Sequence, residues 1–334
     1  MGSPSPLDLF PPFQIPIEIQ TTTQEFSVNK DILPKQYIDG TLRVASVIRC
    51  RFAKGTLLQR GGYGNILLSQ RTDLSGVTQQ ICIKAPHTPT FSLCPEAIIQ
   101  WLASTTLKRA GIIGAIPEVY DIFQYAGETR FSMSYIEGVS SIDYIHRSSD
   151  PERAFLEVVV QVSFLLGYLE ETIYLDHRDL KADNVWIRLS PIKYSARLGE
   201  KLWSLVSPIQ VVLLDFGFSC IGTIEGTAVV SLSDGILPRV DPCPKEGRDV
   251  FQFITSLWSL PSIRAKISQS LATDIEHLLS YKNKPYSTLI RQTSDIHWTY
   301  LLVSDLAFHH PPLHPISLLH TLRIKYPYLI LQCE

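Results

Sequence analysis

The 334-residue chain lacks an excess of charge of either sign and lacks clustered cysteines. Its 30 Lys and Arg residues against 32 Asp and Glu residues give a net charge of −2, which favours neither a nucleic-acid partner nor a membrane surface. The cysteines form no C-x-x-C pair and have no histidine at metal-ligand spacing, so we expect reduced, mostly buried thiols rather than disulfides or a zinc site. The six cysteines are Cys50, Cys82, Cys94, Cys220, Cys243 and Cys333.

Long apolar runs are also missing. The longest run, Val158 to Leu169, is interrupted by Gln161 and Ser163 and is too short to span a bilayer, so it predicts a buried helix. The N-terminal segment MGSPSPLDLFPPF has neither a basic region nor an apolar core, which argues against a secretory signal. We therefore expect an intracellular protein, cytoplasmic or nuclear.

The pattern that is present changes along the chain. The proline-rich first 40 residues predict a loosely ordered lead-in. Short Val-, Ile- and Leu-rich runs from residue 40 to 90 predict strands, and EVYDIF and RFSMSYI predict two more. Between them, a helical pattern begins at Pro95 and ends at Gly111, residue types that suit these two positions.

The second half of the sequence predicts mainly helices. A long apolar helix is expected over residues 152–173, and helical segments run from Asp249 to the end. NVWIRL and IQVVLLDF predict two short strands, and the segment between them, about residues 190 to 208, predicts a surface loop that is open to a partner. A strand-rich first half thus precedes a helix-rich second half.

Four short motifs occur in one order. QRGGYGNI begins at Gln59 in a strand-turn-strand context, and ICIK ends a strand at Lys84. The eight residues H-R-D-L-K-A-D-N run from His177 to Asn184, and D-F-G begins at Asp215 after an apolar strand. Each motif is weak alone, but the long third motif in this order and context is specific.

These residue types suit the transfer of a phosphoryl group. Glycines allow backbone N–H groups to close over phosphate oxygens, and Lys84 supplies a positive charge for the same oxygens. Asp179 can orient an attacking hydroxyl and accept its proton. Asn184 and Asp215 offer the hard oxygen ligands that Mg²⁺ prefers beside phosphate and water. Positioning and charge neutralisation then supply most of the catalysis.

Together these motifs, over about Thr56 to Leu257, resemble the signature set of the eukaryotic-type protein kinases. Lys181, two residues after Asp179, resembles the serine/threonine branch. The resemblance implies an α+β, bilobal protein-kinase-like fold with a small β-rich N-lobe of about five strands and one helix, and a larger helical C-lobe. We assign residues 1–40 to an N-terminal extension, 41–136 to the N-lobe and 137–334 to the C-lobe.

The resemblance also implies roles for single residues. Asp179 would be the catalytic base, Lys181 would contact the γ-phosphate of ATP, and Lys84 the α- and β-phosphates. Asn184 and Asp215 would hold Mg²⁺, with Mn²⁺ as an alternative. The other expected nucleotide-binding residues are Gly61, Gly62, Gly64, Ile66, Cys82, Glu96, Met133, Tyr135 and Trp186.

Within that set, Glu96 would hold Lys84 in place, although it also fits a first-turn acid favoured by the helix dipole. Met133 resembles the gatekeeper, with Ser134 to Ile136 as the hinge that reaches the adenine. Asp249 resembles the buried aspartate that braces the catalytic loop. His177 is expected to pack rather than to carry protons.

Several positions depart from the family pattern. Gln59 replaces the first glycine of the phosphate loop, which is expected to weaken ATP binding without abolishing it. Trp186 replaces a smaller residue beneath the adenine, where it would stack on the purine or crowd it. Gln100 stands where an apolar residue is usual.

No A-P-E follows the D-F-G. The similar tripeptide Cys243-Pro244-Lys245 lies too close to Asp249 to be its equivalent. This trimming resembles divergent kinases of large DNA viruses, which would place the protein in a host cell. The hydroxyls after the D-F-G are expected to be mostly exposed loop groups, some of them open to phosphorylation. They belong to Ser219, Thr223, Thr227, Ser231 and Ser233.

Three functions fit the sequence. The first is an active kinase that phosphorylates Ser or Thr of a protein substrate with ATP, with no nucleic-acid or membrane partner and with an oligomeric state that the sequence leaves open. The second is a pseudokinase that binds ATP or acts as a scaffold, suggested by Gln59, Trp186 and the missing A-P-E. The third is a small-molecule kinase, a group that usually lacks the equivalents of Arg178 and Lys181.

Overall fold

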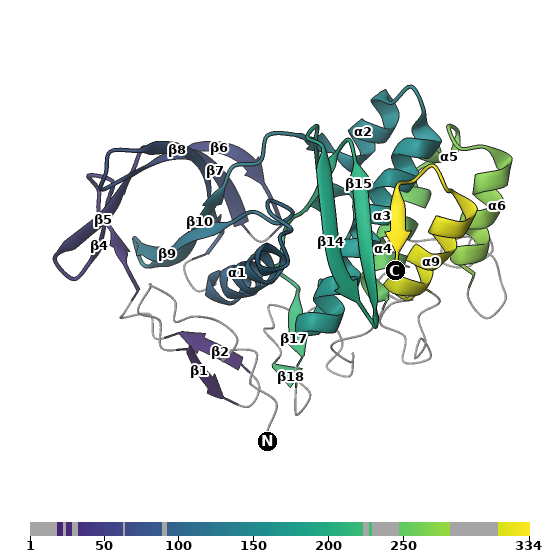
Figure 1. Cartoon of the computed structure of the whole chain (residues 1–334). Helices are drawn as coiled ribbons and strands as arrows, with labels where there is room; N and C mark the ends of the chain where they lie inside the picture. The colour runs from purple at the N-terminus through teal and green to yellow at the C-terminus, as the bar shows by residue number, and fades with distance from the viewer. Residues whose placement is uncertain are drawn as a thin grey trace, which may run out of the picture.

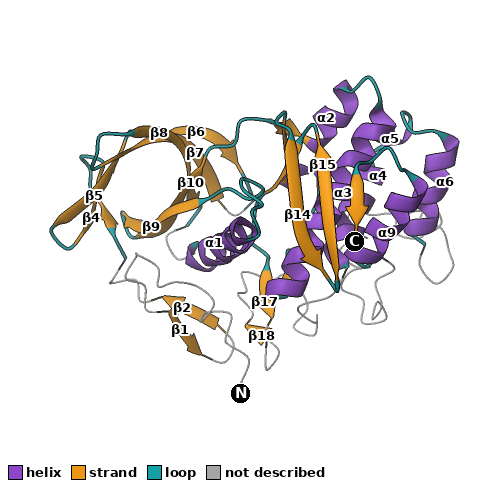
Figure 2. Ribbon diagram, in the orientation of Figure 1, coloured by secondary structure: helices purple, strands orange, loops and turns teal. Residues whose placement is uncertain are grey.

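The computed structural model describes residues 19–22, 25–28, 33–62, 64–88, 92–222, 227–228, 247–280 and 313–334. The strands of the first half gather at one end of the molecule and most helices lie at the other (Figure 1). The same division is visible by secondary structure, with α1 between the two groups (Figure 2). Among the described residues, no helix combines the length and the apolar character needed to cross a membrane.

The N-terminal strands close into a barrel. Seven strands follow one another in the order β5-β4-β3-β9-β10-β8-β7, and β7 pairs back with β5 to complete the ring. β6 extends the sheet beside β7, and the pairs are antiparallel except for β3 with β9. The strands of this sheet are β3 Lys35–Gln36, β4 Thr41–Val44, β5 Val47–Phe52, β6 Thr56–Arg60, β7 Gly64–Asp73, β8 Thr78–Pro86, β9 Val119–Tyr125 and β10 Glu128–Ser134.

This closed barrel contradicts the predicted fold. The structure combines a closed seven-stranded barrel with seven α-helices in the described part of the chain, so the prediction of a bilobal protein-kinase-like fold is wrong. Closure depends on two pairings, Lys35 with Gln124 and Cys50 to Phe52 with Arg71 to Asp73. Strand-forming patterns in a sequence do not reveal such pairings, because the paired residues lie far apart in the chain.

Short strands occupy part of the segment predicted as a loosely ordered lead-in. β1 (Ile19–Thr22) and β2 (Glu25–Val28) form an antiparallel pair, and β3 belongs to the barrel. Residues 1–18 lie outside the described residues. The chain division at residues 40 and 136 stays a prediction.

A small apolar core fills the barrel. Its buried side chains are Leu42, Cys50, Phe52, Ile81, Ile83 and Phe123. The rings of Phe52 and Phe123 lie 5.1 Å apart, so the two walls of the barrel meet through aromatic contact. β8, whose last six residues are buried, carries Lys84 out of this core toward α1.

Helix α1 spans Cys94–Arg109 and confirms the helix predicted from Pro95. Pro95 occupies its first turn, where no backbone N–H is needed, and Gly111 follows its end with φ of 78°. One face of α1 contacts β9 and β10 of the barrel, and another contacts α3. This position places Glu96 and Gln100 between the barrel and the helices.

Helix α3, Pro151–Ile173, is the centre of the helical part and confirms the long apolar helix predicted there. The Asp150 side chain accepts a hydrogen bond from the Arg153 N–H and caps its start, and Tyr174 ends it with φ of 51°. α3 is buried along most of its length against its neighbours. The other helices are α2 Ser141–Arg147, α4 Arg248–Trp258, α5 Pro261–Arg264, α6 Gln269–Leu278, α9 Pro315–Lys325 and the short 3₁₀ helix η2 Ala182–Asn184.

Three small sheets complete the described fold. The predicted strands NVWIRL and IQVVLLDF correspond to β13 and β16, which pair side by side. The segment predicted as a surface loop forms instead a long hairpin, β14 with β15, whose inner face covers α3. The strands of these sheets are β11 Val139–Ser140, β12 Leu175–Asp176, β13 Val185–Arg188, β14 Ile192–Leu198, β15 Lys201–Ser207, β16 Gln210–Leu213, β17 Cys220–Gly222, β18 Thr227–Ala228 and β19 Leu331–Cys333.

The cysteines match the prediction only in part. Cys50, Cys82, Cys94 and Cys333 are free thiols, and the first three are buried. Cys220 is disulfide-bonded, so the expectation of six reduced cysteines is wrong for this position.

Candidate functional site

Lys84 lies at the centre of a buried charge cluster. Its Nζ donates to Glu96 Oε1 on α1 at 2.5 Å and to Asp215 Oδ1 at 2.8 Å. Burial by itself would lower the pKa of Lys84, but the two carboxylates raise it well above its usual range. The lysine is therefore held in its charged form, with the contact to Glu96 that the resemblance implies.

Asp215 follows β16 and faces Lys84. Desolvation of its carboxyl within the cavity opposes ionisation, but the Lys84 ammonium outweighs this effect and lowers the pKa of the Asp215 carboxyl. Its backbone has φ of 62°, in the left-handed region that favours glycine. Such a conformation costs a non-glycine residue about 1–3 kcal/mol and is most often found at functional sites.

The loop that carries Asp179 is anchored from below by α4. Asp249 Oδ2 accepts from the His177 N–H at 2.6 Å, and Oδ1 accepts from the Arg178 N–H at 2.8 Å. Gly247, with φ of 69°, precedes α4 and lets the chain pass close to the Leu313 carbonyl, where a Cβ would not fit. Asp249 thus takes the bracing position that the resemblance implies.

The side chain of His177 also holds this loop in place. The buried ring donates from Nε2 to the Leu214 carbonyl at 2.9 Å and lies 4.9 Å from the Phe216 ring. Burial lowers the pKa of His177, so the ring is neutral at pH 7. Because Leu214 immediately precedes Asp215, this contact links the two halves of the site.

Asp179, Lys181 and Asn184 form a second polar group. Lys181 Nζ donates to Asp179 Oδ2 at 2.9 Å. Asn184 Nδ2 donates to the Asp179 carbonyl at 2.8 Å and more weakly to Oδ2 at 3.3 Å. The Asp179 side chain is therefore oriented by a cation and an amide, and it is only 3% exposed.

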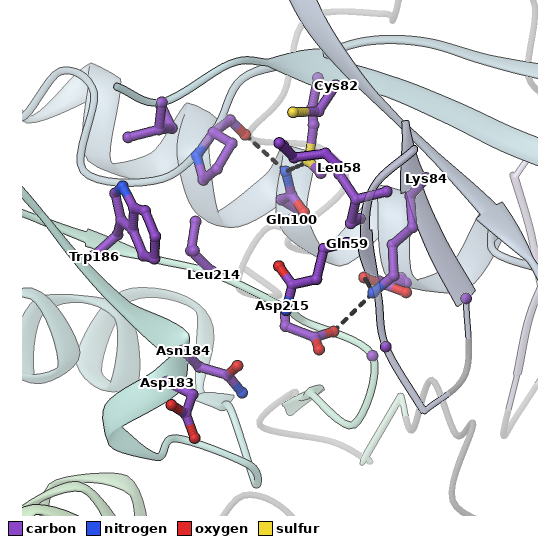
Figure 3. A pocket seen from close by; sticks show the side chains of 18 of the residues that line it. Leu58, Gln59, Cys82, Lys84, Gln100, Asp183, Asn184, Trp186, Leu214 and Asp215 are labelled. Carbon is purple, nitrogen blue, oxygen red and sulfur yellow. Dashed lines mark hydrogen bonds and ion pairs between the residues drawn. The ribbon is translucent and has the colours of Figure 1, made fainter. Parts of the chain in front are cut away.

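One cavity of about 450 Å³ joins these groups (Figure 3). All ten residues predicted to bind the nucleotide line it, and so do Asn184 and Asp215. Asp179 and Lys181 are not among its lining residues and contact it through Asn184. The cavity-lining residues that the sequence did not single out as ligands are Leu58, Gln59, Gln100, Pro117, Asp183, Leu214, Gly217 and Phe218, together with the hinge residues Ser134 and Ile136.

The two ends of the cavity differ in character. Figure 3 shows Asp215 facing Lys84, with Trp186 and Leu214 on the other side of Asp215 and with Asn184 and Asp183 below them. The Cys82 thiol also lines the cavity, and burial raises its pKa to about 11, so it stays a neutral group. The arrangement suits a ligand with an anionic part and a flat apolar part.

Trp186 forms part of the cavity wall because Gly138 leaves room for it. A Cβ at Gly138 would lie 2.8 Å from the indole and 2.4 Å from the Ile187 carbonyl oxygen. Trp186 also pairs in the small sheet with Ser140 on one side and Val212 on the other. The bulk that looked problematic in the sequence is thus accommodated by a glycine on the neighbouring segment.

The charged end fits a divalent cation that is shared with phosphate. Asp215 supplies a carboxylate, and Asn184 retains an amide oxygen because its Nδ2 is the atom bonded to Asp179. Among the described residues, no cluster of three or more His, Cys, Asp or Glu side chains can hold a metal ion alone. Two hard oxygen ligands are what Mg²⁺ uses when phosphate and water complete its octahedron.

The hydroxyl groups after the D-F-G behave differently from the prediction where they are described. Ser219 is buried, and its hydroxyl donates to the His177 carbonyl at 3.2 Å, so it supports the loop rather than standing exposed. Thr227 begins β18. Thr223, Ser231, Ser233 and the segment Cys243-Pro244-Lys245 lie outside the described residues.

Comparison with known proteins adds no family to this picture. No protein-family model matches the chain. No curated protein matches its sequence. The geometry of the site itself is therefore the basis for assigning a function.

Proposed function

We propose that this chain is a serine/threonine protein kinase that transfers the γ-phosphoryl group of Mg·ATP to a protein hydroxyl. The observation that carries the proposal is the single cavity where Lys84, Asn184 and Asp215 meet, with Asp179 directly beside it. The site supports this activity independently of the barrel, since one chemistry recurs on different folds.

Each step of the transfer has a residue suited to it. Lys84, held by Glu96, binds the α- and β-phosphates as a fixed positive charge. Asp179 accepts the proton of the attacking hydroxyl, and Lys181 beside it neutralises charge on the γ-phosphoryl group. A magnesium ion held by Asn184 and Asp215 supplies further charge neutralisation when bound. Gly61, Gly62 and Gly64 let the phosphate loop approach closely.

The substrate and the setting follow from the same chemistry. A serine or threonine hydroxyl as the acceptor follows from the resemblance of Lys181, which pairs with Asp179, to the serine/threonine branch. Consumption of ATP favours an intracellular setting, cytoplasmic or nuclear.

The second candidate is a pseudokinase that binds the nucleotide without efficient transfer. The Gln59 side chain projects into the cavity toward Asp215, where the triphosphate would lie (Figure 3). A side chain in this place favours weak or unproductive phosphate binding. Turnover, rather than binding, separates the two candidates.

The first test measures transfer of labelled phosphate from γ-³²P-ATP and Mg²⁺ to generic protein substrates. Replacing Asp179→Asn keeps the shape and removes the base, so the rate should fall by about 10²–10⁴-fold while nucleotide binding persists. Asp143→Asn, on the exposed surface of α2, is the matched control and should keep the full rate.

Equal rates for the native chain and Asp179→Asn would contradict the proposal. Nucleotide binding without transfer by the native chain, across many substrates, would favour the pseudokinase instead.

A further inference from the structure

Gln100 is a buried polar side chain at the inner wall of the cavity. It lies on α1, one turn after Glu96, and is only 2% exposed. Its side chain nevertheless lines the cavity (Figure 3). A buried amide of this kind needs hydrogen-bond partners, because each unsatisfied polar group costs about 1–3 kcal/mol.

The orientation of the amide is fixed by chemistry. Gln100 Nε2 lies 2.9 Å from the Pro117 carbonyl oxygen and 3.4 Å from Met133 Sδ. A carbonyl oxygen can only accept, so the atom that faces Pro117 must be the N–H donor. Both amide hydrogens therefore have partners in the wall of the cavity.

The other amide atom is left without a partner. Gln100 Oε1 has no hydrogen-bond partner among the described residues, and the Gln100 side chain lines the cavity (Figure 3). Cys82 and Leu214, which also line the cavity, offer little hydrogen bonding. The inner wall thus presents one fixed acceptor within apolar surroundings, which a ligand can satisfy only with an N–H or O–H group.

We infer that Gln100 Oε1 accepts a hydrogen bond from the 6-amino group of adenine and thereby selects adenine over 6-oxo purines. The inference rests on the proposed function: with the phosphates of ATP near Lys84 and Asp215, its purine occupies the remaining part of the cavity, which Gln100 also lines. Adenine presents a donor at position 6, whereas guanine and hypoxanthine present an oxygen that would face the Gln100 oxygen. A buried acceptor opposite another acceptor is left unpaired, and sites of this type reject such analogues strongly.

The test compares binding of ADP and inosine diphosphate by calorimetry in the presence of Mg²⁺. The two ligands share their phosphates and ribose and differ at position 6 and the adjoining ring nitrogen. The native chain should bind ADP at least tenfold more tightly. Gln100→Leu should reduce this preference at least fivefold, through weaker ADP binding with unchanged or tighter binding of inosine diphosphate.

Two further variants make the result decisive. Gln100→Met keeps an unbranched side chain of similar length and should give the same loss of preference if Gln100→Leu does not fold. Gln80 lies on β8, the strand of Cys82 and Lys84, but its side chain is exposed outside the cavity. The Gln80→Leu variant should therefore prefer ADP over inosine diphosphate as strongly as the native chain does.

The inference would be overturned if both Gln100 variants kept the native preference for ADP, or if they bound ADP and inosine diphosphate more weakly by the same factor. Absence of nucleotide binding by the native chain would show that the proposed function itself fails. The two failures are therefore distinguishable before any variant is compared.

Discussion

At the scale of single residues, the site is organised by hydrogen bonds that fix the charge of each group. Lys84 is held charged between Glu96 and Asp215, and His177 is held neutral beside Phe216. The unpartnered Nδ1 of His177 within the described structure agrees with a neutral ring that donates only from Nε2. These protonation states lead to a testable dependence of stability on pH.

Stability should depend on pH through His177. Burial lowers the pKa of His177 below its ordinary value of 6.5, so the unfolded chain binds the proton more readily than the folded chain. The contribution of the neutral His177 ring to the free energy of unfolding is therefore complete above pH 6.5 and is lost as the pH falls below that value. The free-energy advantage of the native chain over His177→Phe should shrink by up to about 1.4 kcal/mol for each pH unit below that point.

Urea unfolding of both proteins at pH 7.5, 6.5 and 5.5 measures this difference. An advantage that stays constant, or that grows in acid, would show that His177 does not titrate as described.

Gln59 should restrict the phosphate end of the cavity. Its side chain projects toward Asp215 and must be displaced or ordered when a triphosphate binds (Figure 3). Ordering one such side chain costs about 0.5–1.5 kcal/mol. Gln59→Gly should therefore tighten ATP binding about 3- to 10-fold, whereas adenosine, which has no phosphate, should bind as before.

Calorimetry with ATP and with adenosine measures both effects. Weaker ATP binding by Gln59→Gly would mean instead that the glutamine amide donates to the phosphates.

At the scale of structural elements, the barrel is joined internally by one carboxylate. Asp121 on β9 accepts from Arg71 Nε on β7 at 2.8 Å and from Ser132 Oγ on β10 at 3.2 Å. The Cys50 thiol on β5 lies 4.0 Å away on the same side. Asp121 thus connects four of the seven strands, including the β5–β7 pair that closes the ring.

Removal of this carboxylate should destabilise the barrel. Asp121→Ala leaves the largely buried Arg71 guanidinium without its partner, and we expect a loss of about 2–3 kcal/mol in the free energy of unfolding. The matched control is Glu118→Ala, which breaks the exposed Lys108–Glu118 pair and should cost at most about 1 kcal/mol. Chemical denaturation compares the two, and equal losses would contradict the central role of Asp121.

The hairpin β14–β15 shows which element could have been predicted. The segment Ile192 to Leu198 alternates strictly between buried and exposed residues, and the sequence IKYSARL carries the same alternation of apolar and polar types. This period of two is the ordinary signal of a half-covered strand. The segment was interpreted as a loop because it interrupts the spacing between two motifs.

At the scale of the whole molecule, local patterns predicted the elements and missed the architecture. Helices α1 and α3 and strands β9, β10, β13 and β16 follow directly from apolar periodicity and from Pro and Gly at helix ends. Barrel closure does not, because it depends on pairings such as Cys50 with Asp73 whose partners the sequence pattern leaves undetermined. The similarity of the motifs to the protein kinases predicts the bilobal fold of that family, and the closed ring of strands contradicts this prediction.

The structure brings together most of the residues that the motifs singled out, although their roles stay predictions. The ten residues predicted to line the nucleotide site, together with Asn184 and Asp215, line one cavity, because the motifs specify side chains at the ends of strands and helices that meet there, whereas Asp179 and Lys181 lie beside it. Gln100 and Gln59 were visible only as departures from the pattern, and their positions in the cavity required three-dimensional contacts. Leu58, Pro117 and Leu214 carry no sequence signal beyond being apolar neighbours of motif residues.

The central claim is that one cavity binds a nucleotide together with a magnesium ion. Its most direct measurement is the affinity for ADP by calorimetry with and without Mg²⁺, in the native chain and in Asp215→Asn. We expect Mg²⁺ to tighten ADP binding at least tenfold, about 1.4 kcal/mol, in the native chain and to have little effect in the variant. ADP binding that is absent, or equally strong with and without Mg²⁺ in both proteins, would contradict the account.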